Sequence, residues 1–183
     1  MTKENEFVAG VGYIDGEFMP YSELRLPITD LGFLFADTCY DTVHIWDGRF
    51  FRLDDHLDRF ERSLALGHYE THGYDRAGIA DVLHGCVARS GLERALATVQ
   101  VTRGTPASGG KDLRTCGNRL IAFAEPYRAV VSEEDLKEGC DIIVAETLRI
   151  PSEAVDPTVK NHNRLDFVRA LFEAYERAAR FAV

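Results

Sequence analysis

The sequence lacks the segments that mark membrane, secreted and phosphate-loop proteins. No apolar run approaches the ~20 residues that span a bilayer. The first six residues are polar and contain no apolar core of a signal peptide. The Gly-x-x-x-x-Gly-Lys-Ser/Thr loop that cradles phosphates is absent as well. We therefore expect a cytoplasmic protein that makes no membrane contact.

Positive charge is also scarce. The chain has 21 lysines and arginines against 30 aspartates and glutamates, which gives a formal net charge of -9. This charge disfavours binding to nucleic acid or to a membrane surface by bulk attraction. The net charge does not exclude binding of a small anionic ligand, because a few arginines in a cleft can override the net field of the protein.

Cysteine and histidine offer no metal-ligand pattern. The four cysteines are widely separated and form no CxxC spacing: Cys39, Cys86, Cys116 and Cys140. The six histidines are dispersed, and the pair at helical spacing, His68 and His72, is a weak metal signal. We predict reduced, packed thiols and no metal site.

Apolar sequence, by contrast, is plentiful. It makes up 45% of the 183 residues, which suits one ordinary domain, or one domain plus part of another. Residues 11–20 contain Asp15-Gly16, a pair typical of the type I′ turn of a β-hairpin. Residues 38–46 are rich in β-branched and aromatic side chains and predict a strand, which Asp47-Gly48 turns back into residues 49–53.

Apolar residues at helical spacing predict helices. One follows an N-cap at Asp54 or Asp55 and continues to Leu66, and a second spans residues 74–90 and ends at Gly91. The other expected elements are strands over residues 95–103, 118–124 and 140–149, a glycine-rich loop over 104–117 and a closing helix over 165–180. This order predicts an α+β fold with a mainly antiparallel sheet.

Two basic side chains occupy places where chemistry could occur. Lys160 lies between a strand-like run and a helical run, and partial desolvation at such a junction favours the neutral, nucleophilic amine. Arg59 lies in the first turns of a helix, where the guanidinium fork and the helix dipole act together on a phosphate. Taken singly, each is more often an ordinary solvated side chain.

Five motifs run through nearly the whole chain and carry more information than either residue. They are Gly32-Phe33 with Asp37, Tyr40-Asp41, residues 46–59, Val101-Thr102-Arg103-Gly104 and residues 156–161. The similarity extends further through Asp166, Val168-Arg169 and Phe172-Glu173-Ala174. Together they resemble the fold-type IV pyridoxal-phosphate enzymes. This group includes the branched-chain and D-amino acid aminotransferases, the (R)-selective amine transaminases and the aminodeoxychorismate lyases. The resemblance to the (R)-selective amine transaminase branch is the greatest over residues 46–59 and 156–161.

The resemblance implies a fold, a cofactor and an assembly. The fold is an N-terminal two-layer α/β sandwich domain of the D-amino acid aminotransferase-like type, followed by the start of the larger cofactor-binding domain. The corresponding divisions are residues 1–126, a connector over 127–139 and residues 140–183. The cofactor is pyridoxal 5′-phosphate, and members of the family form homodimers.

The resemblance also implies roles for three residues. Lys160 would form the Schiff base with the cofactor and act as the proton shuttle, Arg59 would clamp the cofactor phosphate, and Tyr40 would line the substrate pocket. Arg103 lies in a matching motif that is also compatible with a structural element of sheet and loop, so the resemblance assigns it no catalytic role. The implied reaction moves an amino group between an amino acid or primary amine and a 2-keto acid. A lyase acting on an aminodeoxychorismate-like substrate and a catalytically incomplete, dimerising fragment are the alternatives.

The sequence departs from the family near the lysine. Leu165 stands where branched-chain members carry a tyrosine, and Arg164 stands where amine transaminases carry a tryptophan. In the loop after Arg103, Ser108 falls near the place of a substrate-binding arginine, and Arg114 lies later in the same loop. We therefore expect Arg114 or Arg164 to contact a substrate carboxylate.

The length of the sequence also differs from that of family members. Family members carry a glutamate that pairs with the pyridine nitrogen about thirty residues after the lysine, and this sequence ends at Val183 before that point. Without the glutamate the ring nitrogen need not stay protonated, and the cofactor becomes a weaker electron sink. We expect weak or no transamination from these 183 residues alone. A truncated form and a chain completed by another chain are both compatible with the sequence.

Overall fold

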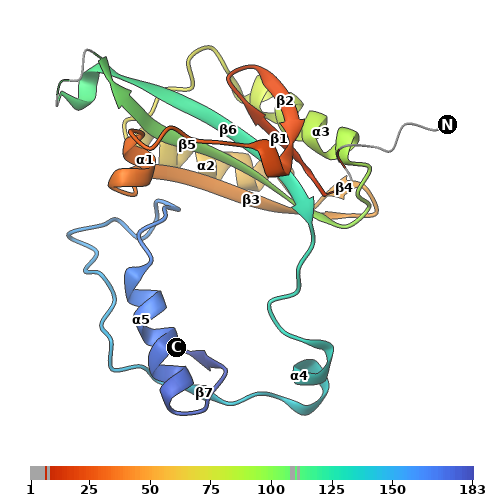
Figure 1. The fold of residues 1–183 in the computed structure, drawn as a ribbon, viewed down its shortest axis with the longest axis vertical. Coiled ribbons are helices and arrows are strands. Elements are labelled where there is room, and N and C mark those ends of the chain that lie inside the picture. The colour runs from red at the N-terminus through yellow and green to blue at the C-terminus, as the bar shows by residue number, and fades with distance from the viewer. Residues whose placement is uncertain (1–6, 8, 108–109, 111) are drawn as a thin grey trace. The chain divides into compact units, whose positions relative to one another are not determined.

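The chain folds as two compact units in the computed structural model (Figure 1). The structure describes residues 7, 9–107, 110 and 112–183. The first unit comprises Met1–Tyr127 with Thr158–His162, and the second comprises Arg128–Pro157 with Asn163–Val183. The short segment around Lys160 therefore belongs to the first unit, although the residues on both sides of it belong to the second. The predicted division into residues 1–126, 127–139 and 140–183 stays a prediction.

The first unit is built on a six-stranded antiparallel sheet. Across the sheet, the strands are β2 (Glu17–Pro20), β1 (Val11–Ile14), β6 (Cys116–Pro126), β5 (Ala95–Pro106), β3 (Thr38–Trp46) and β4 (Arg49–Phe50). The α+β class with a mainly antiparallel sheet is thus confirmed. β3 and β5 lie side by side in the sheet, so every second residue of each strand faces the same side.

Both Asp-Gly hairpin turns are confirmed. Asp15 and Gly16 have φ of 52° and 88°, and Asp47 and Gly48 have φ of 49° and 70°. Positive φ at both central residues is the requirement of the type I′ turn. The return strand β4 is only two residues long, because Arg52 adopts a left-handed φ of 53° and directs the chain into a helix.

Helices α2 (Leu53–Leu66) and α3 (Arg76–Ser90) cover one face of the sheet (Figure 1). Leu57, Phe60 and Leu64 of α2 recur at helical spacing and are buried in the core, with Phe60 at 0% exposure. Gly91 ends α3 with φ of 65°, as predicted. No helix in the described part of the chain is long and apolar enough to cross a membrane.

The predicted N-cap of α2 at Asp54 or Asp55 is wrong. The N-cap residue is Arg52, which makes no side-chain capping bond. Both carboxylates lie inside the first turn, where negative charge still suits the positive end of the helix dipole. Asp55 accepts a hydrogen bond from Nε of Arg52 instead of capping a backbone amide.

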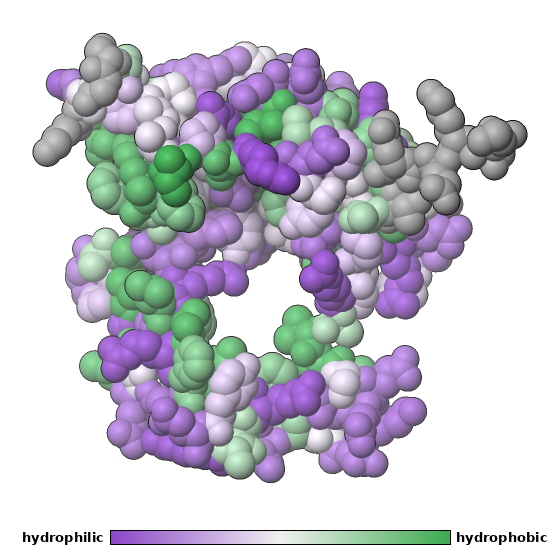
Figure 2. All heavy atoms as spheres, in the orientation of Figure 1, coloured by the Kyte–Doolittle hydropathy of each residue, from purple (hydrophilic) through white to green (hydrophobic). Residues whose placement is uncertain are grey.

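Two short helices before β3 were not predicted. They are the 3-10 turn η1 (Tyr21–Glu23) and α1 (Leu31–Leu34). The fully buried carboxylate of Asp30 caps α1 by accepting from the Gly32 amide at 2.8 Å, and it also accepts from Oγ1 of Thr102 on β5 at 2.9 Å. A long-range contact thus stabilises a helix too short to form alone. Figure 2 shows hydrophobic residues at the surface around α1, where Phe33 and Phe35 are exposed.

The loop predicted over 104–117 is shorter in the structure. β5 continues through Pro106 and β6 begins at Cys116, so both strands extend into the predicted loop. A 3-10 turn, η3 (Leu113–Thr115), lies between them and is capped by Asp112. Ser108, proposed as a replacement for a substrate-binding arginine, lies outside the described residues.

The second unit is small and only partly regular. It contains α4 (Glu133–Glu138), which begins with a capping box at Ser132, and α5 (Leu165–Glu176). β7 (Ile142–Ile143) pairs in parallel with β8 (Phe181–Ala182). Figure 2 shows hydrophobic residues along α5, where Leu165, Phe167 and Phe172 are all more than half exposed.

The strand predicted over 140–149 is largely wrong. Beyond Ile143 one further backbone bond continues the pairing, from the Ala145 amide to the Val183 carbonyl at 3.0 Å, and the regular pairing ends there. The amides of Glu146 and Thr147 donate to the Glu173 carboxylate, and the Ile150 amide donates to the Asp166 carboxylate, both on α5. Side chains from α5 therefore satisfy the donors that a strand would have used. The predicted helix over 165–180 also ends early, at Glu176.

These carboxylates make the second unit sensitive to acid. Hydrogen bonds from Thr147 lower the pKa of Glu173 from 4.5, and those from Ile150 lower the pKa of Asp166 from 3.8. Because the folded pKa values lie below the unfolded ones, their stabilisation is present above about pH 4.5 and is lost as pH falls through the folded values. We expect the far-UV circular dichroism of α5 to decline below that pH before the fluorescence of Trp46 in the first unit changes.

A Glu173→Gln variant supplies the control for this prediction. It keeps the shape of the side chain and removes the charge. The second unit should therefore be less stable at pH 7 and lose less of its helical signal on acidification. Identical acid titrations of the variant and the original chain would contradict the assignment.

The cysteines agree only in part with the prediction of packed thiols. None is in a disulfide. Cys39 and Cys86 are buried, and burial raises the pKa of each thiol to about 12. Cys140 is exposed, so the prediction is wrong for that residue.

Candidate functional site

The backbone of Lys160 is attached to the first unit at the beginning of β3. The Lys160 carbonyl accepts from the Tyr40 amide at 3.0 Å, and the Lys160 amide donates to Oγ of Ser63 at 3.4 Å. Cys39 and Asn161 form an antiparallel bridge beside these bonds. The lysine is thus held by contacts that do not depend on its own side chain.

The Lys160 side chain lies over an aromatic ring. Its Nζ atom is 4.3 Å from the centroid of the Tyr40 ring, and the imidazole of His162 approaches the same ring edge-on at 4.3 Å. Tyr40 itself is only 8% exposed. The buried phenol ring therefore forms a rigid surface under a half-buried primary amine.

The Arg59 side chain is held by a buried carboxylate on β3. Its Nε and Nη2 atoms donate to the two oxygens of Asp41 at 2.7 and 2.8 Å, and this hydrogen-bonded pairing raises the pKa of Arg59. The Asp41 side chain is 2% exposed, whereas that of Arg59 is 43% exposed. Nδ1 of His56 lies 2.8 Å from the same carboxylate.

One turn of α2 connects the arginine and the lysine. Ser63 donates from Oγ to the carbonyl of Arg59 at 3.0 Å and accepts from the amide of Lys160. Tyr40, which contacts Lys160, and Asp41, which binds Arg59, are adjacent on β3. An amine and a guanidinium that are far apart in the sequence are thus brought to the same part of the first unit.

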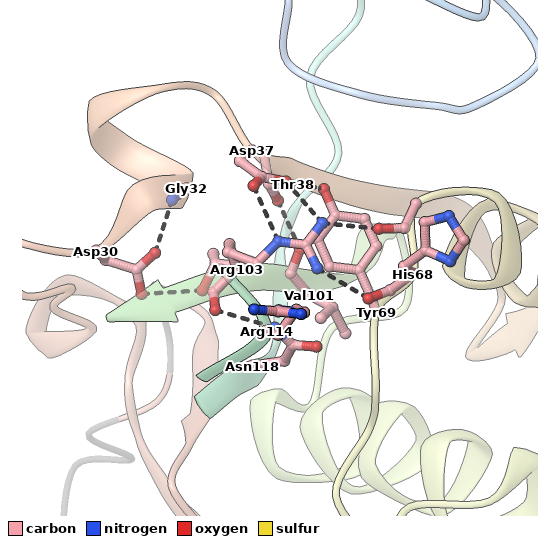
Figure 3. Close-up of polar contacts among 12 residues, drawn as sticks. Asp30, Gly32, Asp37, Thr38, His68, Tyr69, Val101, Arg103, Arg114 and Asn118 are labelled. Atoms are coloured by element: carbon pink, nitrogen blue, oxygen red, sulfur yellow. Dashed lines mark hydrogen bonds and ion pairs between the residues drawn. The ribbon is translucent and has the colours of Figure 1, made fainter. Parts of the chain in front are cut away.

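Arg103 occupies a different cluster, at the far end of the β5–β6 hairpin (Figure 3). It donates from Nε and Nη2 to the carboxylate of Asp37 at 2.9 and 3.1 Å. It also donates to the carbonyls of His68 at 2.8 Å and Gly67 at 2.7 Å, and it lies over the Tyr69 ring at 4.2 Å. Every nitrogen of this guanidinium is used inside the fold, so Arg103 is a structural residue.

Arg114 lies beside the Arg103 cluster (Figure 3). A cavity of about 430 Å³ lies between its loop and residues 67–70, and both arginines line it. Arg114 is 89% exposed in its side chain and forms a two-bond pair with Asp112 of its own loop, at 2.9 and 2.7 Å. This pair lowers the pKa of Asp112.

Arg164 belongs to the second unit, where it is the N-cap residue of α5 and makes no side-chain capping bond. The structure therefore brings three of the predicted site residues together in the first unit, namely Lys160, Tyr40 and Arg59. Arg114 is in the same unit but in another cluster, and Arg164 is in the other unit.

Sequence reasoning missed three polar residues of this cluster. Asp41 and His56 lie inside motifs that predict no separate role for them, and Ser63 lies outside those motifs. The alternation of β3 was a usable signal, because it places Asp41 on the same face as Cys39 and Val43, toward α2. Nothing local in the sequence indicates that Ser63 would meet Lys160.

The family model of the class IV amino-transferases matches residues 38–183. The chain belongs to the class IV aminotransferases. The matched region of this class IV aminotransferase contains β3, Arg59 and the Lys160 segment. It therefore includes the whole cluster described above.

Two curated relatives are similar along much of this chain. A protein of Methanocaldococcus jannaschii, whose name proposes a branched-chain-amino-acid aminotransferase, is 28% identical over 166 residues, which cover 88% of this chain and 54% of the relative. The D-alanine aminotransferase of Staphylococcus haemolyticus is 26% identical over 138 residues, 75% of this chain and 48% of the relative. This class IV aminotransferase chain thus spans about half the length of the curated relatives it matches.

Solved structures share the fold. The branched-chain aminotransferase of the thermophilic archaeon Thermoproteus uzoniensis, solved with norvaline, gives a TM-score of 0.80 at 18% identity and covers 94% of this chain and 58% of that one. The Escherichia coli branched-chain amino acid aminotransferase gives a TM-score of 0.85 at 16% identity, with 95% and 59% covered. At these identities the likeness concerns the fold. It confirms the predicted fold-type IV architecture over the part that this chain contains.

Proposed function

We propose that this class IV aminotransferase chain is the cofactor-holding part of a pyridoxal-phosphate-dependent enzyme. The enzyme moves an amino group between an amino acid or primary amine and a 2-keto acid. The observation that carries the proposal is that Ser63 joins the backbones of Arg59 and Lys160, while Tyr40 beneath the Lys160 amine is next along β3 to Asp41, which binds the Arg59 guanidinium. These two groups are the ones that a phosphorylated aldehyde requires: a nucleophile for the aldehyde carbon and a cationic fork for the phosphate.

The residues present suit this cofactor. Nζ of Lys160 would bind the aldehyde, while the Tyr40 ring limits the directions in which the amine can move. The edge of Arg59 that does not face Asp41 would bind the phosphate. When bound, the pyridine ring supplies the electron sink for amino transfer.

The chain's own residues would supply the proton chemistry. Once its amine is released by an incoming amino substrate, Lys160 Nζ is the base that holds the substrate proton and returns it. Tyr40 would line the substrate pocket beside that amine. The backbone bonds of Lys160 to Tyr40 and Ser63 keep the lysine at this position throughout.

Three finer assignments belong to the same proposal. The (R)-selective amine transaminase branch is supported by the similarity of residues 46–59 and 156–161. A homodimer is supported by the family resemblance, and a cytoplasmic location by the composition. Relatives named for branched-chain and for D-amino acid substrates are both similar to this chain, so the amino acid itself stays open.

The test is a titration of the chain with pyridoxal 5′-phosphate, followed by an amino donor. We expect an absorption band at the edge of the visible range that shifts when the donor is added and is absent in Lys160→Ala. Release of pyruvate from an aminodeoxychorismate-like substrate, without amino exchange, would favour the lyase. Dimerisation with no spectral change at saturating cofactor would favour a non-catalytic fragment.

We predict that Arg164 or Arg114 contacts the substrate carboxylate. A charge-assisted hydrogen bond lost on Arg164→Ala or Arg114→Ala should raise KM for 2-keto acids by about tenfold. The measurement is KM for a keto acid in each variant, with Arg169→Ala on the exposed part of α5 as the matched control. An unchanged KM removes the respective arginine from the substrate site.

A further inference from the structure

The carboxylate of Asp41 is the most enclosed charged group near the proposed cofactor site. Its side chain is 2% exposed and it receives three hydrogen bonds from α2. Two come from Arg59 and the third involves Nδ1 of His56. A buried charge is stable only when it is paired and hydrogen-bonded, so this arrangement accounts for the ionised carboxylate.

The geometry also assigns the His56 tautomer. A carboxylate that accepts two parallel bonds from a guanidinium is ionised and can only accept. The 2.8 Å contact with His56 therefore requires a proton on Nδ1 of the imidazole. His56 acts as a third donor that holds Asp41 in the plane of the Arg59 fork.

The consequence appears at the opposite edge of the arginine. Asp41 occupies Nε and Nη2 of Arg59, while the two N–H groups of Nη1 make no hydrogen bond within the described residues. The side chain is 43% exposed, so this edge can be reached from solvent. An arginine held in this way offers its remaining donors in one fixed direction.

We propose that Asp41, supported by His56, is a positioning residue that directs the Nη1 edge of Arg59 toward the phosphate of the cofactor. This inference rests on the proposed function. It adds to that function a determinant of cofactor affinity that does not touch the cofactor. A free arginine side chain would have to lose its rotamer freedom on binding phosphate, whereas this one has already lost it on folding.

The negative charge of Asp41 acts in the opposite direction, because it repels a phosphate. Two features make the positioning effect the larger one. Arg59 and His56 both donate to the carboxylate, which spreads its charge, and the phosphate edge is exposed to water. At an ionic strength of 0.15 M the Debye length of about 8 Å screens what remains.

The first test compares two ligands on Asp41→Asn. Affinity for pyridoxal 5′-phosphate should fall about tenfold, while affinity for pyridoxal, which lacks the phosphate, should stay unchanged. Lysine has no guanidinium for Asp41 to orient. In an Arg59→Lys background, Asp41→Asn should therefore change the affinity for pyridoxal 5′-phosphate by less than about twofold. A general structural defect would instead lower the affinity for both ligands, and the loss would persist in the Arg59→Lys background. That result would overturn the proposal. So would an Asp41→Asn chain that binds pyridoxal 5′-phosphate as tightly as the original or more tightly.

A second measurement needs no variant, which matters if Asp41→Asn does not fold. The Nε–H signal of Arg59 in ¹H–¹⁵N spectra reports its bond to Asp41, and inorganic phosphate is the probe. We expect inorganic phosphate to shift the Arg59 Nε–H signal, because phosphate binds to the neighbouring Nη1 atom. The Nε–H group should stay protected from exchange with water, because its bond to Asp41 persists. Loss of that protection would show that phosphate and Asp41 compete for the arginine, which overturns the proposal. No shift at saturating phosphate would overturn it as well.

The two proposals fail separately. If phosphate shifts the protected Arg59 signal but the chain never bonds pyridoxal phosphate covalently, the positioning role of Asp41 stands and the proposed function fails. If the cofactor bonds to Lys160 with equal affinity in Asp41→Asn and in the original chain, the proposed function stands and the positioning role of Asp41 fails.

Discussion

Lys160→Ala should remove covalent capture of pyridoxal 5′-phosphate completely. The amine over the Tyr40 ring is the nucleophile of the proposed site, and Lys160 is the only lysine among the described residues of the first unit. The measurement is reduction of the cofactor complex with borohydride, digestion and mass analysis of the peptide that contains residue 160. We expect the labelled peptide in the original chain and none in the variant.

The variant should remain folded, which makes the result interpretable. The contacts that attach this segment to β3 and α2 involve the amide and carbonyl of residue 160, and alanine retains both. Lys137→Ala is the matched control, because Lys137 lies in the last turn of α4 in the second unit and should not affect specific labelling. Undiminished labelling of Lys160→Ala, or its loss in Lys137→Ala, would contradict the assignment.

Arg103→Ala should destabilise the first unit by roughly 3 kcal/mol, because it breaks a largely buried ion pair and leaves several acceptors without a donor. The Arg103 and Asp37 side chains are only 13% and 23% exposed. The substitution would leave Asp37 with the hydroxyl of Tyr69 as its remaining side-chain donor, at 2.6 Å. It would also free the carbonyls of Gly67 and His68 (Figure 3). Burial and the bond to Asp37 already raise the pKa of Tyr69, so that phenol stays neutral and cannot supply the lost cation.

Denaturant unfolding followed by the fluorescence of Trp46 would measure the effect. Arg114→Ala is the matched control. It removes an arginine from the same hairpin, but one whose side chain is 89% exposed in its ion pair with Asp112. The control should change the free energy of unfolding by less than about 0.5 kcal/mol. Equal losses in the two variants would show that the Arg103 cluster contributes nothing beyond a surface pair.

Local rules predicted the elements whose signals are local. Each Asp-Gly pair demanded positive φ at two successive residues, and the structure has these turns at Asp15-Gly16 and Asp47-Gly48. The apolar spacing of Leu57, Phe60 and Leu64 specified the buried side of α2. The strand over residues 38–46 was predicted with the bounds it has, because its composition and its following turn agreed.

The incorrect predictions have a common cause in long-range partners. Residues 144–150 have the composition of a strand, but the amides of Glu146, Thr147 and Ile150 are satisfied by carboxylates of α5, which lie more than twenty residues away for Glu146 and Thr147. α1 has only four residues and depends on a bond between Asp30 and Thr102 of β5. No propensity scale contains such contacts, because they exist only after the distant segment has folded nearby.

The amino-acid sequence by itself determined the chemical types of the site. It supplied one lysine and one helical arginine in motifs specific enough to indicate a phosphorylated aldehyde cofactor. Only the tertiary structure decided how they are held. Antiparallel pairing and the packing of α2 on β3 bring Asp41 to Arg59 and Ser63 to Lys160. The orientation of a long, flexible side chain depends on such partners, which lie far along the chain and close in space.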